Sequence, residues 1–454
     1  MPAAVDPARR AAYDVLRAVT ERGAYANLVL PGLLRERGIS GRDAAFATEL
    51  AYGTLRWQGT YDAVLAACVD RPLDRVDPTL RDALRLGTHQ LLALRVATHA
   101  AVSVTVDLAR AVAGEGAARF ANAVLRRVAA RPLSDWITEL APAYADDPVA
   151  HLALAHAHPR WVVAALRDAL GGDLGETAAA LAADNIPAAV TLAARPGRAT
   201  RDDLVAAGAS PARWSPYAAH LSGGGDPAAL DVVRRGVAGV QDEGSQLVAL
   251  ALANTPVEGA DRRWLDLCAG PGGKAALLAG IGGLVGQRDA ALLAVELRPH
   301  RAALVARSLR GSAGRYAVVV ADARVAAWQS GAFDRVLVDV PCSGLGALRR
   351  RPESRWQRGP ADVAALGRLQ RELLAAALDA VRPGGVVAYA TCSPHLAETR
   401  VVVDDVLRKR PAVDRVDARP ALDGVPDLGD GPDVQLWPHR HGTDAMYLAL
   451  LRRR

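Results

Sequence analysis

Five short apolar runs recur between residues 264 and 390, and each has the length of one buried strand. The runs are Trp264–Leu267, Leu292–Glu296, Ala317–Val320, Arg335–Asp339 and Gly385–Ala390. Helical patterns fill the gaps between them, notably over residues 302–309 and 361–381. Strands that are apolar on both faces and alternate with helices predict a parallel sheet covered on both sides. We therefore expect an α/β, Rossmann-like domain over residues 237–454, with any ligand at the carboxyl ends of its strands.

A glycine-rich turn follows the first of these strands. Its sequence is Cys268-Ala269-Gly270-Pro271-Gly272-Gly273-Lys274. Glycines let the backbone approach a ligand closely, and the next helix presents a partially positive N-terminus. A phosphate-binding P-loop needs Ser or Thr after the lysine, where this chain has Ala275, and the GxGxxG dinucleotide pattern is also not matched. Lys274 is one of only two lysines in a chain that otherwise uses arginine, which indicates a need for a compact ammonium group here.

Two acidic residues follow the next two strands. Glu296 ends the second strand, where a carboxylate can accept hydrogen bonds from ribose hydroxyls. Asp322 follows the third strand, where it would meet the base of a nucleoside. Each acid alone is equally well explained as a loop or capping residue. Together, and in this order, they favour a nucleoside cofactor bound without a phosphate clamp, of which S-adenosylmethionine is the obvious case.

Two of the four cysteines lie at strand ends, and each precedes a serine. Cys342 occurs in Asp339-Val340-Pro341-Cys342-Ser343-Gly344, and Cys392 occurs in Thr391-Cys392-Ser393. Carbon 5 of a pyrimidine becomes nucleophilic when a thiolate adds to carbon 6, provided that an acid protonates the ring nitrogen and a base later removes the carbon 5 proton. Asp339 is the nearest candidate acid. A redox-sensing cysteine pair is the alternative that the sequence leaves open.

The first 236 residues carry no comparable chemistry. Residues 1–134 have helical spacing of apolar residues, with Asp77-Pro78 as one helix start, and predict an all-helical domain. Proline-bearing segments between residues 131 and 148 indicate a joint. Residues 135–236 then mix helix and strand patterns, with Thr200 and Asp203 as a capping box, and predict a small α/β module.

The composition is that of an ordinary globular protein. Apolar residues make up 51% and charged residues 23% of 454 residues, and the formal net charge is +6, which suits a polyanion such as RNA. No apolar run reaches the roughly 18 residues of a membrane span. The start Met1–Asp6 does not resemble a secretion signal, so we expect a cytoplasmic protein. Scattered cysteines, and His439 and His441 without a third ligand nearby, predict no metal site.

An arginine-rich segment closely follows Cys342. It contains Arg349, Arg350, Arg351, Arg355 and Trp356. Arginines beside an active site would line an RNA groove, and a tryptophan can stack on a base. The alternative is a solvated loop. Further along the chain, the stretch 411–433 is rich in Pro, Gly and acidic residues and is expected to be a surface loop.

These motifs resemble bacterial small-subunit ribosomal RNA cytosine-5 methyltransferases of the Sun/Fmu type, the methyltransferase B family. The resemblance rests on the glycine turn, the two cysteine motifs, the segment 441–444 (His-Gly-Thr-Asp), the entry to the catalytic domain at 240–246 and the end of a NusB-like helical domain at 120–127. It covers most of the chain. Gly270 departs from the family, which usually has alanine at that position.

The resemblance implies roles for individual residues. The cysteine at the position of Cys392 is the nucleophile, and the cysteine at the position of Cys342 assists release. S-adenosylmethionine would be bound by the segment Cys268–Lys274 together with Glu296, Asp322 and Asp339. The helical domain and the small module would contact RNA.

The sequence therefore predicts S-adenosylmethionine-dependent methylation of carbon 5 of a cytosine in 16S ribosomal RNA, by a protein expected to be a monomer. A transfer RNA methyltransferase with the same catalytic domain is one alternative, which the NusB-like region disfavours. A non-catalytic RNA-binding factor is another, which the retention of both cysteines and of Asp339 disfavours.

Overall fold

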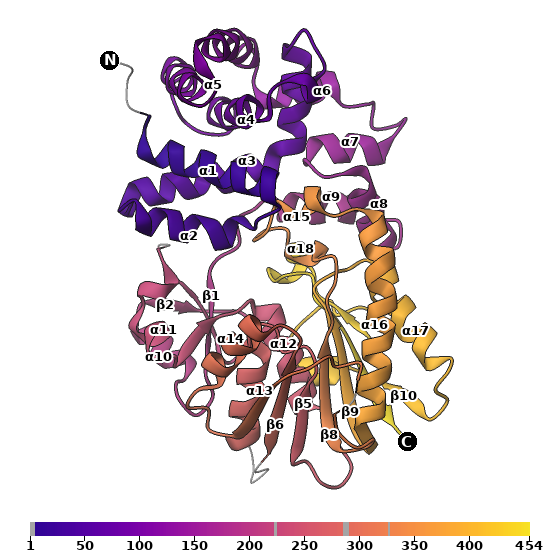
Figure 1. The fold of residues 1–454 in the computed structure, drawn as a ribbon. Coiled ribbons are helices and arrows are strands. Elements are labelled where there is room, and N and C mark those ends of the chain that lie inside the picture. The colour runs from indigo at the N-terminus through magenta and orange to yellow at the C-terminus, as the bar shows by residue number, and fades with distance from the viewer. Residues whose placement is uncertain (1–4, 222–224, 285–289, 326) are drawn as a thin grey trace. The chain divides into compact units, whose positions relative to one another are not determined.

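The computed structural model describes residues 5–221, 225–284, 290–325 and 327–454, which form two compact units (Figure 1). Unit 1 contains the chain up to residue 187 together with residues 348–357, and unit 2 contains residues 188–347 and 358–454. Residues 1–4, on which the localisation prediction partly depends, lie outside the described residues. In the described ranges, no helix is both long and apolar enough to cross a lipid bilayer.

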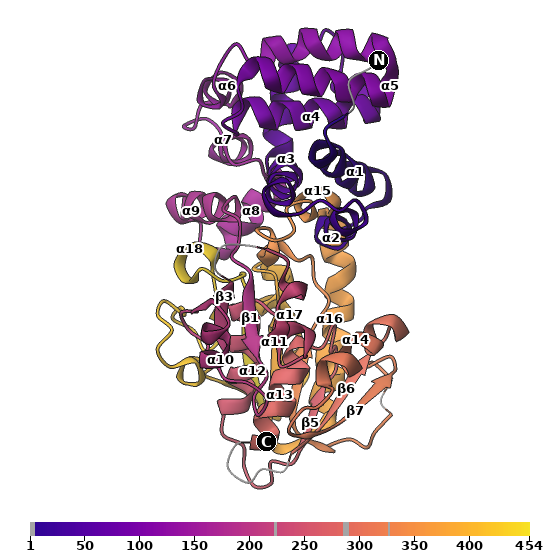
Figure 2. The ribbon, with the colours of Figure 1, turned by 90° about the vertical axis from the view of Figure 1, so that its left-hand side faces the viewer.

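Unit 1 is helical, as the apolar spacing predicts. Its long helices are α1 (Pro7–Arg22), α2 (Ala26–Glu36), α3 (Gly41–Cys68), α4 (Pro78–Leu92) and α5 (Thr98–Val128). The side chain of Asp77 accepts the backbone N–H groups of Thr79 and Leu80, which confirms the predicted start of α4. One apolar cluster joins α1, α2 and α3 and also contains residues of α4 and α5, and a second lies mainly among α3, α4 and α5. Figure 2 shows these helices from another side.

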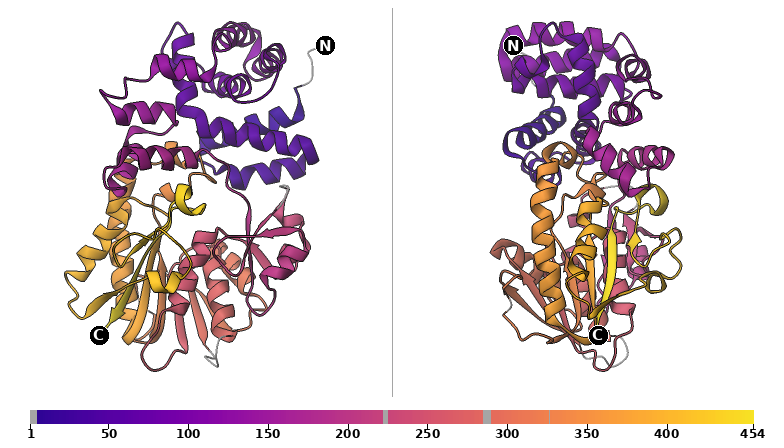
Figure 3. Two further views of the ribbon diagram at one scale, coloured as in Figure 1. Left: turned by 180° about the vertical axis from the view of Figure 1, so that it is seen from behind. Right: turned by 90° about the vertical axis from the view of Figure 1, so that its right-hand side faces the viewer.

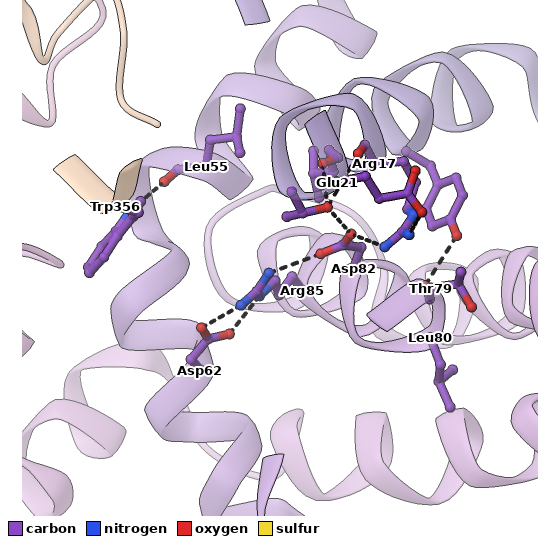
Figure 4. Close-up of polar contacts among 12 residues, drawn as sticks. Arg17, Glu21, Leu55, Asp62, Thr79, Leu80, Asp82, Arg85 and Trp356 are labelled. Carbon is purple, nitrogen blue, oxygen red and sulfur yellow. Dashed lines mark hydrogen bonds and ion pairs between the residues drawn. The ribbon is translucent and has the colours of Figure 1, made fainter. Parts of the chain in front are cut away.

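A buried ion network joins three of these helices (Figure 4). Asp82 on α4 is 1% exposed and accepts hydrogen bonds from Arg17 on α1 at 2.8 Å and from Arg85 at 2.9 Å. Arg85 also contacts both carboxylate oxygens of Asp62 on α3, each at 2.7 Å. Removing one partner of a buried pair strands a charge and costs about 3–5 kcal/mol. The network therefore fixes the positions of α1, α3 and α4 relative to one another.

Residues 135–236 do not form one separate unit. Helices α6 (Leu133–Leu140), α7 (Pro148–Ala155), α8 (Arg160–Ala169) and α9 (Leu174–Asp184) belong to unit 1, whereas the strands that follow belong to unit 2. The strands form a sheet in the order β2 (Ala209–Pro211), β3 (Ala218–Leu221), β1 (Thr191–Ala194) and β4 (Ala238–Val240). Because β4 pairs with β1, this sheet extends past residue 236. The predicted capping box of Thr200 and Asp203 starts α10 (Arg201–Ala206) and is confirmed.

The expected α/β domain is the larger part of unit 2 (Figure 3). The order of its main sheet is β10-β12-β9-β8-β5-β6-β7, and β11 pairs with β12. The strands are β5 (Arg263–Asp266), β6 (Ala291–Glu296), β7 (Arg315–Val320), β8 (Phe333–Asp339), β9 (Val381–Thr391), β10 (Val413–Val416), β11 (Val434–Gln435) and β12 (Tyr447–Arg453). Strands β5 to β9 pair in parallel, as predicted, and β12 runs antiparallel to β9.

Helices cover both faces of this sheet. One face packs against α12 (Glu243–Asn254), α13 (Gly273–Leu284) and α14 (Pro299–Leu309), and the other packs against α16 (Pro360–Ala380) and α17 (Arg400–Leu407). Trp264 and Leu265, which are adjacent on β5, belong to the apolar clusters on opposite faces. Alternate side chains of a strand point to opposite faces, so a sheet covered on both sides needs the continuous apolar runs seen in the sequence.

One expectation about this domain is wrong. The stretch 411–433, expected to be a surface loop, contains strand β10 and a 3-10 helix over Arg419–Leu422. Strand β10 pairs with the last strand of the chain, with Val413 beside Arg453 and Val416 beside Leu450. The pairing partner lies far along the sequence, so the local composition of proline, glycine and acidic residues did not reveal it.

Candidate active site at the carboxyl edge of the sheet

The carboxyl ends of the central strands bring the predicted site residues to one edge of the sheet. Strand β5 ends at Asp266, β6 at Glu296, β8 at Asp339 and β9 at Thr391, next to Cys392. Strands β6 and β8 flank β5, so the strand order reverses beside β5. Open α/β sheets bind ligands at such a switch point.

The glycine turn leaves β5 at this position and depends on glycine in two ways. Gly270 has a φ of 58° and Gly272 a φ of 96°, in the left-handed region that other residues rarely adopt. A Cβ atom on Gly272 would lie 2.8 Å from the Cβ of Ser308 on α14. The turn is therefore too close to α14 for a side chain at residue 272. Gly270 stands where the resembling family usually has alanine, and its left-handed backbone conformation is one that glycine adopts without strain.

Glu296 supports the turn from the neighbouring strand. Its side chain is buried and accepts the backbone N–H of Gly270 at 3.1 Å and that of Arg298 at 3.0 Å. A carboxylate oxygen has two lone pairs, so each oxygen retains the capacity to accept a hydrogen bond from a ligand hydroxyl. Glu296 thus lies where the sequence places it and also shapes the turn.

Asp322 lies after β7 and is partly exposed. Its carboxylate makes an ion pair with Arg324 at 2.6 Å and accepts the backbone N–H of the same residue at 3.0 Å. The hydrogen bond from Arg324 lowers the pKa of Asp322. In this structure Asp322 is therefore engaged by a neighbour within its own loop.

Lys274 and Asp339 form an ion pair, with 2.8 Å between Nζ and Oδ2. Burial alone would lower the pKa of Lys274, but the charge and the hydrogen bond of Asp339 outweigh it and raise this pKa. The compact ammonium predicted from the sequence therefore serves to bind the acid at the end of β8.

Asp266 is a site residue that the sequence analysis did not select. It is 1% exposed, its Oδ1 atom accepts the backbone N–H of Cys268 at 3.3 Å, and its Oδ2 atom has no hydrogen-bond partner. Burial, and then the charge of Asp339, raise the pKa of Asp266 to about 7. An unsatisfied buried carboxylate oxygen beside the glycine turn fits a cationic ligand group, such as the ammonium or sulfonium of S-adenosylmethionine. Its position at the end of β5 was the available sequence signal.

The two predicted cysteines lie in contact, with 3.3 Å between their Sγ atoms. The hydrogen bond with Cys392, and then burial, raise the pKa of Cys342, whereas the hydrogen bond from Cys342 lowers the pKa of Cys392. Either thiol can donate in this contact, and the opposite directions of the two pKa shifts favour Cys342 as the group that keeps the proton. Of the two residues, Cys392 is the one prepared to be a thiolate. Burial raises the pKa of Cys268, the cysteine within the glycine turn, well above its usual value.

The arginine-rich segment belongs to unit 1, where it packs against helices. Arg355 is fully buried and donates to the carbonyl oxygens of Arg56 at 3.3 Å and Ala157 at 3.2 Å. The indole N–H of Trp356 donates to the carbonyl oxygen of Leu55 on α3 at 3.2 Å (Figure 4). These side chains are occupied by protein contacts. Arg351 is exposed, and its guanidinium lies 5.2 Å from the centre of the Tyr25 ring.

The sheet order, the glycine turn and the acids at the switch point define a methyltransferase of the kind that binds a nucleoside cofactor. The profile of the 16S rRNA methyltransferase RsmB/F family matches residues 251–452, and that of the NusB family matches residues 6–130. A Mycobacterium tuberculosis (strain H37Rv) protein whose name carries only the general term methyltransferase is 58% identical over 99% of this chain and 97% of its own length. Ribosomal RNA small subunit methyltransferase B of Pseudomonas putida is 32% identical over 98% of each chain.

Solved structures share the fold. The protein PH0851 covers 100% of both chains with a TM-score of 0.81 at 21% identity. A methyltransferase homolog from Pyrococcus horikoshii covers 68% of this chain and 99% of its own, with a TM-score of 0.55 at 20% identity. The chain belongs to the 16S rRNA methyltransferase RsmB/F family and carries a NusB-family helical domain. It is an RNA methyltransferase that uses S-adenosylmethionine.

Proposed function

We propose that this enzyme methylates carbon 5 of a cytosine in 16S ribosomal RNA and that Cys392 forms a covalent adduct with the ring. Membership of the family supports the class of substrate, and the relative from Pseudomonas putida is named for the small ribosomal subunit. The observation that carries the proposal is the 3.3 Å contact between Cys342 and Cys392 at two neighbouring strand ends. Methylation of a ring carbon needs a thiolate and a second group that handles protons, and this pair supplies both.

The first half of the reaction forms the adduct. The thiolate of Cys392 bonds to carbon 6, and the electron pair of the carbon 5–carbon 6 double bond moves toward carbon 5 and the ring nitrogen. We assign protonation of that nitrogen to Asp339. The proton comes from the ammonium of Lys274, 2.8 Å from Asp339, which passes it through Asp339 and regains it when the ring nitrogen releases it. When bound, S-adenosylmethionine would supply the methyl group to carbon 5 as an electrophilic carbon, with the methyl–sulfonium bond breaking to leave a neutral thioether.

The second half releases the product. Once the sulfur of Cys392 is bonded to carbon, it no longer accepts the proton of Cys342, and that proton passes to water. The thiolate of Cys342 then removes the proton from carbon 5. The double bond re-forms, the bond between carbon 6 and sulfur breaks, and Cys392 returns as a thiolate. The ring nitrogen gives its proton back to Asp339.

The cofactor site that we propose consists of Cys268–Lys274, Glu296, Asp322 and Asp339, with Asp266 added. We assign the ribose hydroxyls to Glu296; the assignment is supported by its contact with the glycine turn, which leaves the adjacent strand. Asp322 serves the base of the nucleoside once its side chain turns from Arg324. The buried Oδ2 atom of Asp266 receives the positively charged end of the cofactor.

For RNA we propose contacts from Arg350 and above all the exposed Arg351, together with the NusB-like helices. Arg349, which the sequence also predicts as a contact, is buried and is not included. Burial of Arg355 and the indole hydrogen bond of Trp356 assign these two residues to anchoring the segment within unit 1. We also propose that the enzyme acts as a monomer in the cytoplasm, where bacterial ribosomes are assembled.

The product of the reaction tests this function. The enzyme is incubated with methyl-labelled S-adenosylmethionine and, separately, with 16S RNA, isolated small subunits or transfer RNA, and the RNA is digested to nucleosides for mass spectrometry. We expect 5-methylcytidine in small-subunit RNA alone. Labelled 5-methylcytidine in transfer RNA would support the alternative substrate, and methyl groups on any other atom would contradict the proposal. Bisulfite sequencing of RNA from a deletion strain then identifies the target nucleotide.

A further inference from the structure

A fully buried carboxylate, Glu398, lies behind the two cysteines and has no part in the mechanism above. It ends the 3-10 helix Leu396–Glu398 and is 0% exposed. Its Oε1 atom accepts the backbone N–H of Ser343 at 2.7 Å and the side-chain amide N–H of Gln370 at 3.1 Å, and its Oε2 atom accepts the hydroxyl of Ser343 at 2.5 Å. None of these donors carries a charge. Burying an ionised group costs free energy, so a buried carboxylate that is held by these neutral donors indicates a role beyond packing.

The carboxylate fixes the chain on both sides of Cys342. Ser343 follows Cys342 directly and donates twice to Glu398. Gln370 on α16 donates to Glu398 and also, at 2.9 Å, to the carbonyl oxygen of Pro341, which precedes Cys342. Cys342 therefore lies between two residues that the same buried pair holds in place.

The same carboxylate reaches the turn of Cys392 through two hydroxyl groups. The Oγ atoms of Ser343 and Ser393 lie 3.1 Å apart, and both residues are buried. Because Ser343 gives its hydroxyl proton to Glu398, it can only accept from Ser393. The hydroxyl of Ser393 in turn accepts the backbone N–H of His395 at 3.2 Å. The chain of hydrogen bonds thus runs in one direction, from the residue after Cys392, through the residue after Cys342, to Glu398.

We propose that Glu398 is a positioning residue for the cysteine pair: through Ser343 and Ser393 it holds the two Cys-Ser turns in contact, and its charge assigns the shared proton to Cys342. The proposal rests on the proposed function, since it explains how Cys392 becomes the nucleophile. The proposal also explains why a serine follows each cysteine: the two hydroxyl groups link both turns to Glu398.

Other charged groups also act on the two sulfur atoms. Cys342 faces Cys392 and, further away, the carboxylate of Glu398 and the phenol of Tyr389, whose pKa is raised well above its usual value by burial. Cys392 faces Cys342, Asp339, Asp444 and Lys274. Among these groups Glu398 is the one that acts on Cys342 through the residue bonded to it. Its negative charge disfavours a second negative charge on Cys342, so the proton stays there and leaves Cys392 as the thiolate.

Alkylation of the free enzyme tests this assignment without RNA or cofactor. Both cysteines are partly exposed, and a thiolate reacts with iodoacetamide where a thiol does not. The enzyme is pulsed with iodoacetamide from pH 6 to 9, and the peptides of Cys342 and Cys392 are quantified by mass spectrometry. We expect the wild type to label mainly at Cys392. Glu398→Gln keeps the size of the side chain but removes its charge, and should lower the ratio of Cys392 to Cys342 labelling about tenfold, in proportion to roughly one pKa unit.

Two further variants make the result specific. Glu243→Gln removes another buried carboxylate, which accepts the backbone N–H groups of Trp214 and Ser215, and should leave the labelling ratio unchanged. Ser393→Ala breaks the link between the turns while Glu398 keeps its charge, and should lower the ratio several-fold. If Glu398→Gln folds poorly, Ser393→Ala still tests the proposal.

The outcomes separate two failures. Equal labelling of both cysteines in the wild type would contradict the choice of Cys392 as nucleophile, whatever Glu398 does. Preferential labelling of Cys392 that persists unchanged in folded Glu398→Gln, or in Ser393→Ala if only that variant folds, would overturn the role of Glu398 and leave the proposed function standing.

Discussion

Lys274 on the glycine turn binds Asp339 at the end of β8, with 2.8 Å between Nζ and Oδ2. This contact crosses the switch point of the sheet and joins the cofactor side of the site to the strand that leads to Cys342. The side chain of Lys274 is 11% exposed and that of Asp339 is 29% exposed, so the pair is only partly screened by water. Its two charges act on Cys392 in opposite directions: Asp339 raises the pKa of this cysteine and Lys274 lowers it.

Replacing Lys274 should make Cys392 a weaker thiolate. The hydrogen bond from Cys342 lowers the pKa of Cys392 most, and Lys274 adds to that effect. In Lys274→Met the pH midpoint of Cys392 alkylation should rise by about 0.5–1 unit, the effect of losing a neighbouring charge worth about 1 kcal/mol. Lys409→Met, which replaces the other lysine of the chain at an exposed position, is the control. An unchanged midpoint in Lys274→Met would show that the ion pair does not influence the nucleophile.

Asp266→Asn should stabilise the folded protein at pH 8 and at the same time weaken its binding of the cofactor. The pKa of Asp266 is raised to about 7 in the folded protein. Its contribution to stability is therefore present below the ordinary Asp pKa of about 4 and is lost as pH rises toward 7. We expect the variant to unfold at a higher temperature than the wild type at pH 8, with the difference vanishing near pH 4, and to bind S-adenosylmethionine more weakly at pH 8. Calorimetric scans and titrations measure both. Equal unfolding temperatures at pH 8 would contradict the raised pKa.

Glu296→Ala should weaken binding of S-adenosylmethionine by roughly 1–3 kcal/mol, the range for leaving buried polar groups without a partner. The variant removes both the acceptor for the ribose and the group that holds the N–H of Gly270. Titration calorimetry measures the change. Asp404→Ala on α17, which removes an exposed carboxylate paired with Arg415, is the control and should bind normally. Parental affinity in Glu296→Ala would remove this residue from the site.

Simultaneous replacement of Arg350 and Arg351 by Ala, which leaves the buried Arg349 in place, should raise the apparent KM for RNA. Each phosphate contact that is lost should reduce the slope of log affinity against log salt by about one unit. The control is Arg368→Ala, which removes an arginine whose side chain is 88% exposed on α16. If variant and parent share the same salt slope, the segment serves packing alone.

The sheet and most of its site residues could be predicted from the sequence because they depend on local patterns. Apolar runs predict buried strands. The carboxyl ends of parallel strands lie at one edge of a sheet, so Glu296, Asp339, Cys342 and Cys392 could be predicted to lie there together.

Other parts depend on contacts between distant residues. Arg355 looked like part of an exposed basic loop, yet it is buried against carbonyl groups of Arg56 and Ala157. Glu398 acts through Ser343, which is 55 positions away. Both relationships join residues that are far apart in the sequence, so local sequence patterns do not predict them. The burial of Arg355 and Glu398 is seen only in the folded structure.

The central claim, that Cys392 attacks the ring and Cys342 releases it, is tested most directly by comparing two variants on one denaturing gel. Each is incubated with small-subunit RNA and S-adenosylmethionine. Cys342→Ala should form the adduct and fail to break it, and should therefore show a slowly migrating covalent species. Cys392→Ala should show neither that species nor turnover. A covalent species with Cys392→Ala instead would reverse the two roles, and full turnover by both variants would contradict covalent catalysis by this pair.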